Sequence, residues 1–213
     1  MKVKFTSFSA GIAAIVVLVA GCSGGTTPSP PPVSPDTSTS SSSAGKTLPY
    51  AGAPKVENPL PDSVLSTHPC DSAFTSEQVG KVLGKEVQGK HADNASLGAQ
   101  CHWTNSDSGA ILTVLYVTKV SDGLSAVYAN SKPQSTVWRS LPSVQGFPAV
   151  AHSAYGPQGD KSFCQVSIGI SDQHDVDVSV TLSPSKVGAT NPCDVTAQIS
   201  DMVASNLKKK AGA

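Results

Sequence analysis

The chain has 213 residues, with 15 basic and 15 acidic side chains that give a formal net charge of zero, and only 14% of its residues are charged. Arg139 is its only arginine, so the sequence lacks the basic surface that nucleic-acid binding requires. The length allows one domain of ordinary size with a buried core.

The first 21 residues have the pattern of an export signal. Lys2 and Lys4 precede a run of small and apolar residues, 10–20, which is too short to span a membrane. The run ends in Val19-Ala20-Gly21-Cys22, which resembles the bacterial lipobox, the motif after which signal peptidase II cuts. The resemblance implies that Cys22 carries a diacylglycerol, which anchors the protein on the outer side of the cell membrane. The alternative is an uncleaved N-terminal helix with an incidental cysteine.

Residues 22–62 are predicted to be a lipidated N-terminus followed by a disordered tether. They consist mainly of Ser, Thr, Pro and Gly, as in the segments 28–32 and 38–43, and cannot bury enough apolar surface to offset chain entropy. A flexible coil of this length reaches roughly 35 Å. The alternatives are a proline-rich ligand for another protein or a glycosylation stalk.

Four cysteines remain when Cys22 is set aside: Cys70, Cys101, Cys164 and Cys193. An even number in an oxidising compartment indicates two disulfides, for which three connectivities are possible. No two of them have C-x-x-C spacing, so we expect no thiolate-bound metal, redox motif or cofactor.

The folded domain is predicted over residues 63–210, and its clearest helix follows Thr75. Thr75 and Gln78 match a capping box, and Phe74 and Val79 occupy the positions of a hydrophobic staple. Gly84 supplies the left-handed residue that ends such a helix.

Strands come next. One surrounds Cys101 and Trp103, and a turn at 105–109 leads into a strand over 110–120, whose two apolar faces are typical of a central strand covered on both sides. A short helix is predicted around 124–128.

The second half of the domain repeats this order. A strand over 163–170 turns at 171–175 into 176–182, where apolar and polar residues alternate as in a half-exposed hairpin. A last helix begins at Pro192 or Asp194 and ends in the lysines 208–210, where cations complement the helix dipole. We therefore expect an α+β fold, a mostly antiparallel sheet with helices packed on one face.

A short repeat favours one pattern of disulfides. Pro-Cys-Asp occurs at 69–71 before the first helix and at 192–194 at the start of the last, and each half has a cysteine-bearing strand that leads into a hairpin. Two related units, each joining a helix entry to a neighbouring strand, favour the pairs Cys70–Cys101 and Cys164–Cys193. The alternative is chance similarity of short pieces.

The order of these features resembles a known family, the actinobacterial lipoproteins of domain of unknown function 3558. The resemblance covers nearly the whole chain. It includes the lipobox, the tether, Pro69-Cys70-Asp71 before a helix that ends in Leu83-Gly84, Cys101-x-Trp103, and the late pair Cys164 and Pro192-Cys193. Because that family has no established activity, the resemblance implies a location and a fold, and it transfers no catalytic residue.

Two groups of residues could indicate chemistry, and neither favours it. Ser183-Pro184-Ser185-Lys186 matches the S-x-x-K motif of penicillin-interacting enzymes, but Pro184 and Gly188 predict a loop instead of the helical turn that the motif needs. An acidic group near a predicted hairpin tip could hold calcium, yet turns favour Asp for backbone reasons alone. Its members are Asp172, His174, Asp175 and Asp177.

Trp138 and Arg139 are the best candidates for a contact surface, because both residue types are enriched at binding hot spots. Phe147 and Tyr155 are further exposed candidates in the same Gly- and Pro-containing stretch. The alternative is that Trp138 covers the core of the sheet.

These features together predict a membrane-anchored extracytoplasmic lipoprotein that is not an enzyme. We expect a binding or sensor-like module of the cell envelope whose partner is an envelope protein or glycan. The alternatives are a small carrier of hydrophobic compounds or solutes and, third, a cell-wall hydrolase using Ser183 or a histidine.

Overall fold

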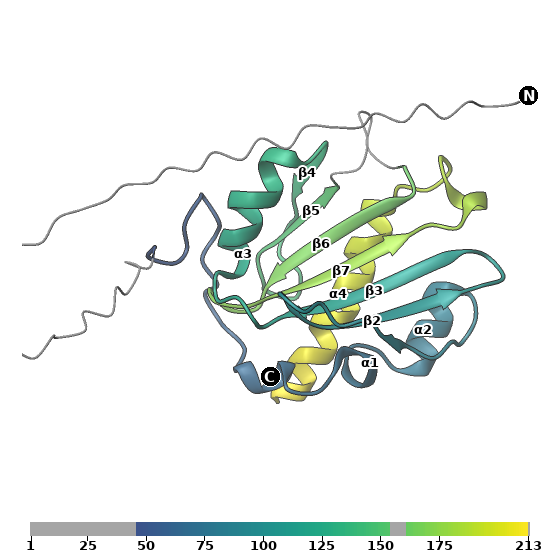
Figure 1. Ribbon diagram of the computed structural model, residues 1–213, viewed down its shortest axis with the longest axis horizontal. Helices are drawn as coiled ribbons and strands as arrows, with labels where there is room; N and C mark the ends of the chain where they lie inside the picture. Colours follow the sequence, from purple (N-terminus) through teal and green to yellow (C-terminus); the bar gives the residue numbers. More distant parts are fainter. Residues whose placement is uncertain (1–45, 154–160, 213) are drawn as a thin grey trace, which may run out of the picture. The chain divides into compact units, whose positions relative to one another are not determined.

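The computed structural model describes residues 46–153 and 161–212 (Figure 1). Within these ranges, one antiparallel sheet has seven strands in the order β1-β2-β3-β7-β6-β5-β4. The strands are β1 (Lys90–His91), β2 (Gly98–Asn105), β3 (Ala110–Val117), β4 (Val137–Ser140), β5 (Ala149–Ser153), β6 (Phe163–Gly169) and β7 (Asp175–Thr181). The predicted α+β fold with an antiparallel sheet is confirmed.

The two cysteine-bearing hairpins meet at the centre of the sheet. The hairpin β2–β3 and the hairpin β6–β7 join where β3 pairs with β7, with Val114 opposite Val178. The repeat in the sequence therefore corresponds to two hairpins that lie edge to edge, and β7 is the middle strand.

Short helices and one long helix complete the fold. They are η1 (Asp62–Leu65), α1 (Pro69–Ser72), α2 (Ser76–Leu83), α3 (Gly123–Ala126), η2 (Val127–Ser131), η3 (Lys132–Gln134), η4 (Pro184–Lys186) and α4 (Pro192–Ala211). The capping box predicted for α2 is present, since the Thr75 side chain accepts from the Gln78 N–H and the Gln78 side chain accepts from the Thr75 N–H. Gly84 ends the helix with φ 76°.

The main core lies between the sheet and the helices α1, α2 and α4. In Figure 1, α4 crosses behind β6 and β7. Its Val203 and Leu207 are fully buried and belong to one cluster with Val166 and Val178 of the sheet. The helices on this face agree with the expectation of helices packed on one side, but they are not the only ones that contact the sheet.

The segment from α3 to η3 packs on the opposite face of the sheet. Leu124, Val127 and Tyr128 form a second cluster with Val150 of β5, whose neighbours Ala149 and Ala151 belong to the main core. A short helix predicted near 124–128 is thus confirmed, and it covers only part of this face.

The folded domain begins before residue 63, where we had placed its boundary. Val56 and Leu60 are buried in the main core. The Val56 N–H donates to Asp172 Oδ1 at 2.9 Å and the Leu60 N–H donates to the Ile170 carbonyl at 2.9 Å. The predicted tether over 22–62 is therefore too long at its C-terminal end, because two isolated apolar residues are enough to fix this segment against the turn before β7.

The strand predicted over 110–120 ends at Val117. The N–H groups of Thr118 and Lys119 donate to the carbonyl of Leu97 and leave the ladder. Leu112 and Val114 are fully buried, whereas Ile111 and Thr113 on the other face are half-buried. The predicted double coverage therefore holds only for the last residues of β3.

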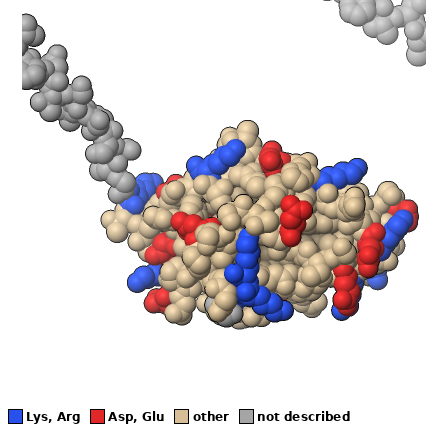
Figure 2. Space-filling model, turned by 90° about the horizontal axis from the view of Figure 1, so that it is seen from below, with Lys and Arg blue, Asp and Glu red and all other residues tan. Residues whose placement is uncertain are grey.

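The surface carries charges of both signs. On the face shown in Figure 2, basic and acidic side chains are interspersed among larger areas without charge. Such a surface suits a protein with a net charge of zero.

Candidate functional site

The structure joins Cys70 to Cys101 and Cys164 to Cys193, as the repeat predicted. The Cα atoms of the two pairs are 5.1 and 5.0 Å apart. The first bond links α1 to β2, and the second links β6 to the start of α4. Each bond therefore fixes the entry of a helix to a strand of the sheet.

A cavity of about 580 Å³ lies beside the Cys70–Cys101 disulfide. Its walls come from α1, α2, the connection from α2 to β1, and β2. The lining residues are Cys70, Asp71, Phe74, Ser76, Val79, Glu86, Val87, Gln88, Gly89, His91 and Trp103. They include two carboxylates and neither Lys nor Arg, so the cavity favours a positively charged or neutral polar ligand.

The base of this cavity is apolar and its rim is polar. Phe74 and Trp103 are buried and meet edge to face, with ring centroids 5.4 Å apart. Asp71 and Glu86 are exposed at the rim. This combination of an aromatic base with a few polar groups is common in small-molecule sites.

Gly89 allows the backbone that forms one wall of the cavity to pack closely against its neighbours. A Cβ atom at this position would lie 2.8 Å from Trp103 Nε1 and closer still to Cys101 Sγ. Only glycine therefore allows the chain leading into β1 to pass so near the disulfide and the indole ring.

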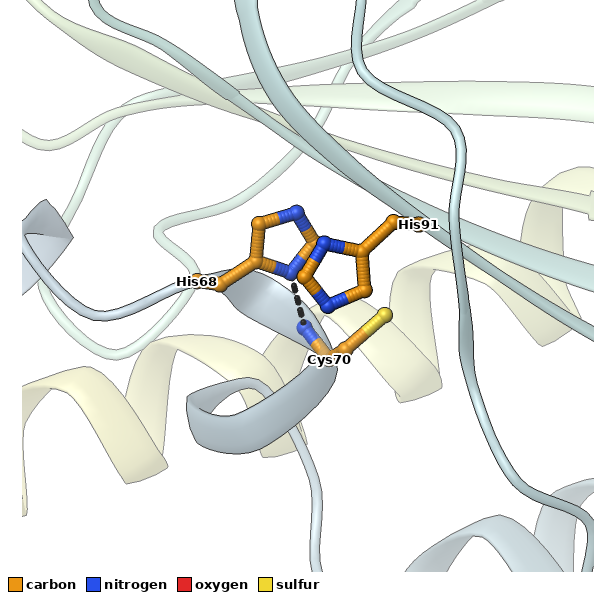
Figure 3. A group of neighbouring side chains, drawn as sticks. All are labelled: His68, Cys70 and His91. Atoms are coloured by element: carbon orange, nitrogen blue, oxygen red, sulfur yellow. Dashed lines mark hydrogen bonds between the residues drawn. The ribbon is translucent and has the colours of Figure 1, made fainter.

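Two histidines stack beside the disulfide (Figure 3). The ring centroids of His68 and His91 are 3.6 Å apart, and the ring planes differ by 10°. His68 is the N-cap of α1, where its Nδ1 accepts from the Cys70 N–H at 3.1 Å. An accepting Nδ1 leaves the proton on Nε2, which lies 2.8 Å from Asp93 Oδ1. The hydrogen bond from His68 lowers the pKa of Asp93.

A second polar group lies on the opposite half of the sheet. The His152 Nε2 atom of β5 is 3.1 Å from the Ser167 hydroxyl of β6, and that hydroxyl also bonds the Asp177 carboxylate of β7. Asp175 lies two residues before Asp177 in the same strand and on the same face of the sheet, so the two carboxyl groups are neighbours. His152, Ser167 and Asp177 thus form one chain of hydrogen bonds across three strands, with Asp175 beside its end.

Burial controls the ionisation of this chain. It lowers the pKa of His152 to about 4 and raises the pKa of Asp177 to about 6. Burial and the neighbouring Asp177 charge raise the pKa of Asp175 well above its ordinary value. Asp175 is 2% exposed, and the rise in its pKa favours the protonated, neutral form of this carboxyl group.

This chain has the residue types of a nucleophilic triad but not its order. In such a triad the histidine stands between the nucleophile and the carboxylate, whereas here Ser167 stands between His152 and Asp177. Ser167 is also fully buried. The arrangement serves hydrogen bonding inside the sheet rather than nucleophilic attack.

A smaller cavity of about 270 Å³ opens at the His152 end of this chain. It lies between η2–η3 and the strands β5 and β6. Its lining residues are Asn130, Ser131, Gln134, His152, Ser153, Phe163 and Gln165.

Trp138 and Arg139 have different neighbours in the structure. Trp138 packs against Tyr128 and His152, with ring centroids 5.0 and 5.7 Å apart. Arg139 extends from the other side of β4 and pairs with Asp194 at 2.7 Å. The two side chains therefore lie on opposite faces, as neighbours in a strand do, and Trp138 covers the second apolar cluster. The contact surface predicted for Trp138 and Arg139 stays a prediction.

The acidic group and the S-x-x-K motif bring no site together either. Asp172 accepts from the backbone of Val56, while Asp175 and Asp177 lie inside the sheet. The Ser183 hydroxyl is 3.1 Å from that of Ser185 in the loop around η4, and Lys186 is exposed. Of the other predicted positions, Phe147 is buried, whereas Cys22 and Tyr155 lie outside the described residues.

The histidine pair was missed in the sequence. His68 and His91 are 23 positions apart, and they meet only because β1 pairs with β2 so that His91 lies opposite Cys101. A signal was present in the spacing His68-x-Cys70, which places a histidine at the entry of the disulfide-bearing helix.

Comparison with known proteins identifies one family. The model of the family described as "Protein of unknown function (DUF3558)" matches residues 17–206. Neither the curated proteins nor the solved structures contain a match to the chain.

Proposed function

From the premise that this chain belongs to the DUF3558 family, we propose that it is a lipid-anchored actinobacterial protein on the outer side of the cell membrane. Its domain is a non-catalytic binding module for a small ligand that carries a positive charge. The observation that carries the proposal is the acidic cavity beside the Cys70–Cys101 disulfide.

The proposed anchor rests on the sequence of the first 22 residues. The basic start, the apolar run and Val19-Ala20-Gly21-Cys22 are the features that supported it above. Within 46–153 and 161–212, every helix is too short or too polar to cross a bilayer. Attachment through a lipid on Cys22 would hold the domain near the membrane without a spanning segment.

The proposed binding function rests on the rigidity and the charge of the cavity. The disulfide, the stacked histidines and the Phe74–Trp103 pair hold its walls. A site that is already formed binds with a smaller loss of conformational entropy. Its rim offers Asp71 and Glu86, which favour a ligand with an ammonium or guanidinium group.

The alternatives have less support from the geometry. A carrier of hydrophobic compounds needs a deep apolar pocket, whereas the exposed rim of this cavity is acidic and polar. A hydrolase that uses Ser183 would need a base at its hydroxyl, and the partner found there is Ser185.

Binding is tested with pairs of small compounds that differ only in charge. The full-length chain in detergent is titrated with alkyl ammonium and guanidinium compounds and with carboxylates of equal size, while amide shifts are followed by NMR. We expect shifts at the lining residues for cations, and an affinity at least about tenfold weaker in the double variant Asp71→Asn/Glu86→Gln. Equal binding of carboxylates, or no loss in the variant, would remove the cavity from the proposal.

The anchor is tested separately by mass spectrometry of the protein from membranes of an actinobacterial host. The expected N-terminal peptide begins at a diacylglycerol-modified Cys22, and a Cys22→Ser variant should leave the membrane fraction. An unmodified thiol at Cys22 in a cytosolic protein would contradict it.

A further inference from the structure

His68, Cys70 and His91 bring together the atoms that zinc prefers. One nitrogen of each imidazole and the Cys70 Sγ atom all lie within 4.8 Å of one another (Figure 3). Imidazole nitrogen and thiolate sulfur are the usual ligands of Zn²⁺ in proteins. None of the three is distant from solvent, since His91 is exposed and the other two are half-buried.

Two features keep the group from binding metal while the disulfide is closed. The Cys70 sulfur is bonded to Cys101 and is not a thiolate. The imidazole planes are nearly parallel, so the nitrogen lone pairs, which lie in those planes, do not converge on one point. The oxidised protein is therefore not a metal site.

We propose that opening the Cys70–Cys101 disulfide converts this group into a site for a divalent cation of the Zn²⁺ class. A dithiol reductant supplies two electrons and two protons, and it is itself oxidised to a disulfide. The S–S bond breaks and two thiols form. The metal then displaces the proton of the Cys70 thiol and binds its sulfur together with one nitrogen of each imidazole.

One ring nitrogen of His68 already has the partner that metal-binding histidines commonly have, whereas the other, Nδ1, would exchange its N-cap hydrogen bond for the metal. Its Nε2–H donates to the Asp93 carboxylate at 2.8 Å, and its Nδ1 lone pair points toward the Cys70 amide. Histidines that bind metals commonly donate their second ring N–H to a carboxylate, which fixes the tautomer and raises basicity. The ligand atoms have little distance to travel, because those around tetrahedral zinc are roughly 3.3–3.8 Å apart, but the His91 ring must turn out of the stack so that its lone pair points to the metal.

The Cys164–Cys193 disulfide cannot become a metal site of this kind. Cys164 and Cys193 are both buried in the main core, and no histidine joins them in a metal-binding group within the described ranges. The proposal is thus specific to the first disulfide. It does not depend on the proposed membrane anchor or on the organic ligand, although Cys70 and His91 also line the cavity.

Two variants of the full-length chain in detergent test the site without a reductant. Cys101→Ala and Cys70→Ala remove the same disulfide, but only Cys101→Ala keeps the thiol of Cys70 beside the two histidines. With Co²⁺ as the probe, we expect a 1:1 complex with near-ultraviolet thiolate charge-transfer absorbance for Cys101→Ala. Cys70→Ala should bind Co²⁺ at least about tenfold more weakly, and the oxidised wild-type chain should show no such band.

A histidine control separates the site from general binding by a free thiol. His91→Ala added to Cys101→Ala should weaken Co²⁺ binding at least about tenfold, whereas His102→Ala should not change it. Equal binding by Cys70→Ala and Cys101→Ala, no binding by either, or no effect of His91→Ala would overturn the proposal. Circular dichroism shows whether the cysteine variants fold. If they do not, a phosphine is used to reduce the Cys70–Cys101 disulfide in the wild-type chain and in His91→Ala, and alkylation confirms which disulfide has opened. Co²⁺ binding at least about tenfold weaker in the reduced His91→Ala chain supports the proposal, and equal binding overturns it.

Discussion

The two disulfides close loops of nearly equal length, with sequence separations of 31 and 29 residues, but they lie in different surroundings. Cys164 and Cys193 are enclosed between β6 and α4. Cys70 lies in the wall of an open cavity beside two histidines. The ionisable groups differ in the same way, because Asp71, Glu86 and Asp93 are exposed whereas His152 and Asp175 are buried.

This difference shows that the same structural unit, a helix entry joined to a strand by a disulfide, occurs in two different surroundings. In the C-terminal half, the long helix α4 covers the cysteine-bearing strand and the disulfide becomes part of the core. In the N-terminal half, α1 and α2 have only 4 and 8 residues. They leave space over β2, so the same kind of bond lies in the wall of a cavity.

Removing each disulfide measures this contrast most directly. In the chain-entropy model each loop contributes about 3.5 kcal/mol. Paired alanine substitution of Cys164 and Cys193 should lower the free energy of unfolding by about 1 kcal/mol more than the same change at Cys70 and Cys101, because it also empties enclosed volume. Urea unfolding of the two double variants gives both values. Equal losses of unfolding free energy would mean that the surroundings of Cys70–Cys101 are packed as tightly as those of Cys164–Cys193.

Gly89 tests how closely the cavity wall is packed. Gly89→Ala should lower stability by about 3 kcal/mol, since its Cβ would overlap the Trp103 ring and the disulfide sulfur. Gly80→Ala is the matched control, because its Cβ would come closest to the Glu86 side chain at 3.0 Å and would meet the Glu86 backbone only at ordinary contact distance, and alanine favours a helix. Thermal unfolding of both variants gives the comparison. A stable Gly89→Ala protein would show that the wall can move.

The pH dependence of stability tests the buried groups of the C-terminal half. The folded pKa of Asp177 is raised to about 6, so its contribution is present below pH 4 and is lost as pH rises through 6. The folded pKa of His152 is lowered to about 4, so its contribution is present above pH 6.5 and is lost as pH falls through 4. Between pH 4 and 6 the two effects oppose each other, and the raised pKa of Asp175 acts in the same direction as that of Asp177.

Single variants should separate the contributions of Asp177 and His152 to the pH dependence of the free energy of unfolding. On acidification from pH 6.5 to 4, Asp177→Asn should gain less stability than the wild-type chain, because it loses one raised carboxyl and keeps Asp175 and His152. His152→Gln should gain more than the wild-type chain, because it loses the group that opposes both carboxyls. Urea midpoints at several pH values measure this. Asp93→Asn is the control from the exposed half and should leave the shape of the profile unchanged. Parallel profiles for Asp177→Asn and His152→Gln would contradict the buried chain of hydrogen bonds.

Local signals in the sequence were enough to predict much of the fold. The capping box at Thr75 and Gln78 depends on residues three positions apart and predicted α2 correctly. The Pro-Cys-Asp repeat predicted both disulfides. These predictions were correct because the residues that make the contacts are close together in the sequence, as in the capping box, or occur in a motif that appears twice.

The candidate site was not predicted because it depends on register and coverage. His68 meets His91 only through the pairing of β1 with β2. Asp175 alternates with apolar residues like an exposed strand position, yet α3 places Leu124 against Gly169, the residue opposite Asp175. Contacts of this kind join segments that no short pattern in the sequence connects.

Substitution of Arg139 should have the smallest effect on the free energy of unfolding. It also tests whether ligand binding is confined to the N-terminal half of the domain. Its ion pair with Asp194 lies on the exposed edge strand β4 at the start of α4, where such pairs contribute about 0.5 kcal/mol. Arg139→Ala should therefore change stability by no more than about that amount and should leave Co²⁺ and cation binding at the N-terminal half unchanged. Trp138→Ala, its neighbour on the opposite face, should be several times more destabilising, because its ring packs on Tyr128 and His152. Paired urea titrations and cation titrations measure both. If Arg139→Ala weakened cation binding, the contact surface predicted from the sequence would gain support against the cavity beside Cys70.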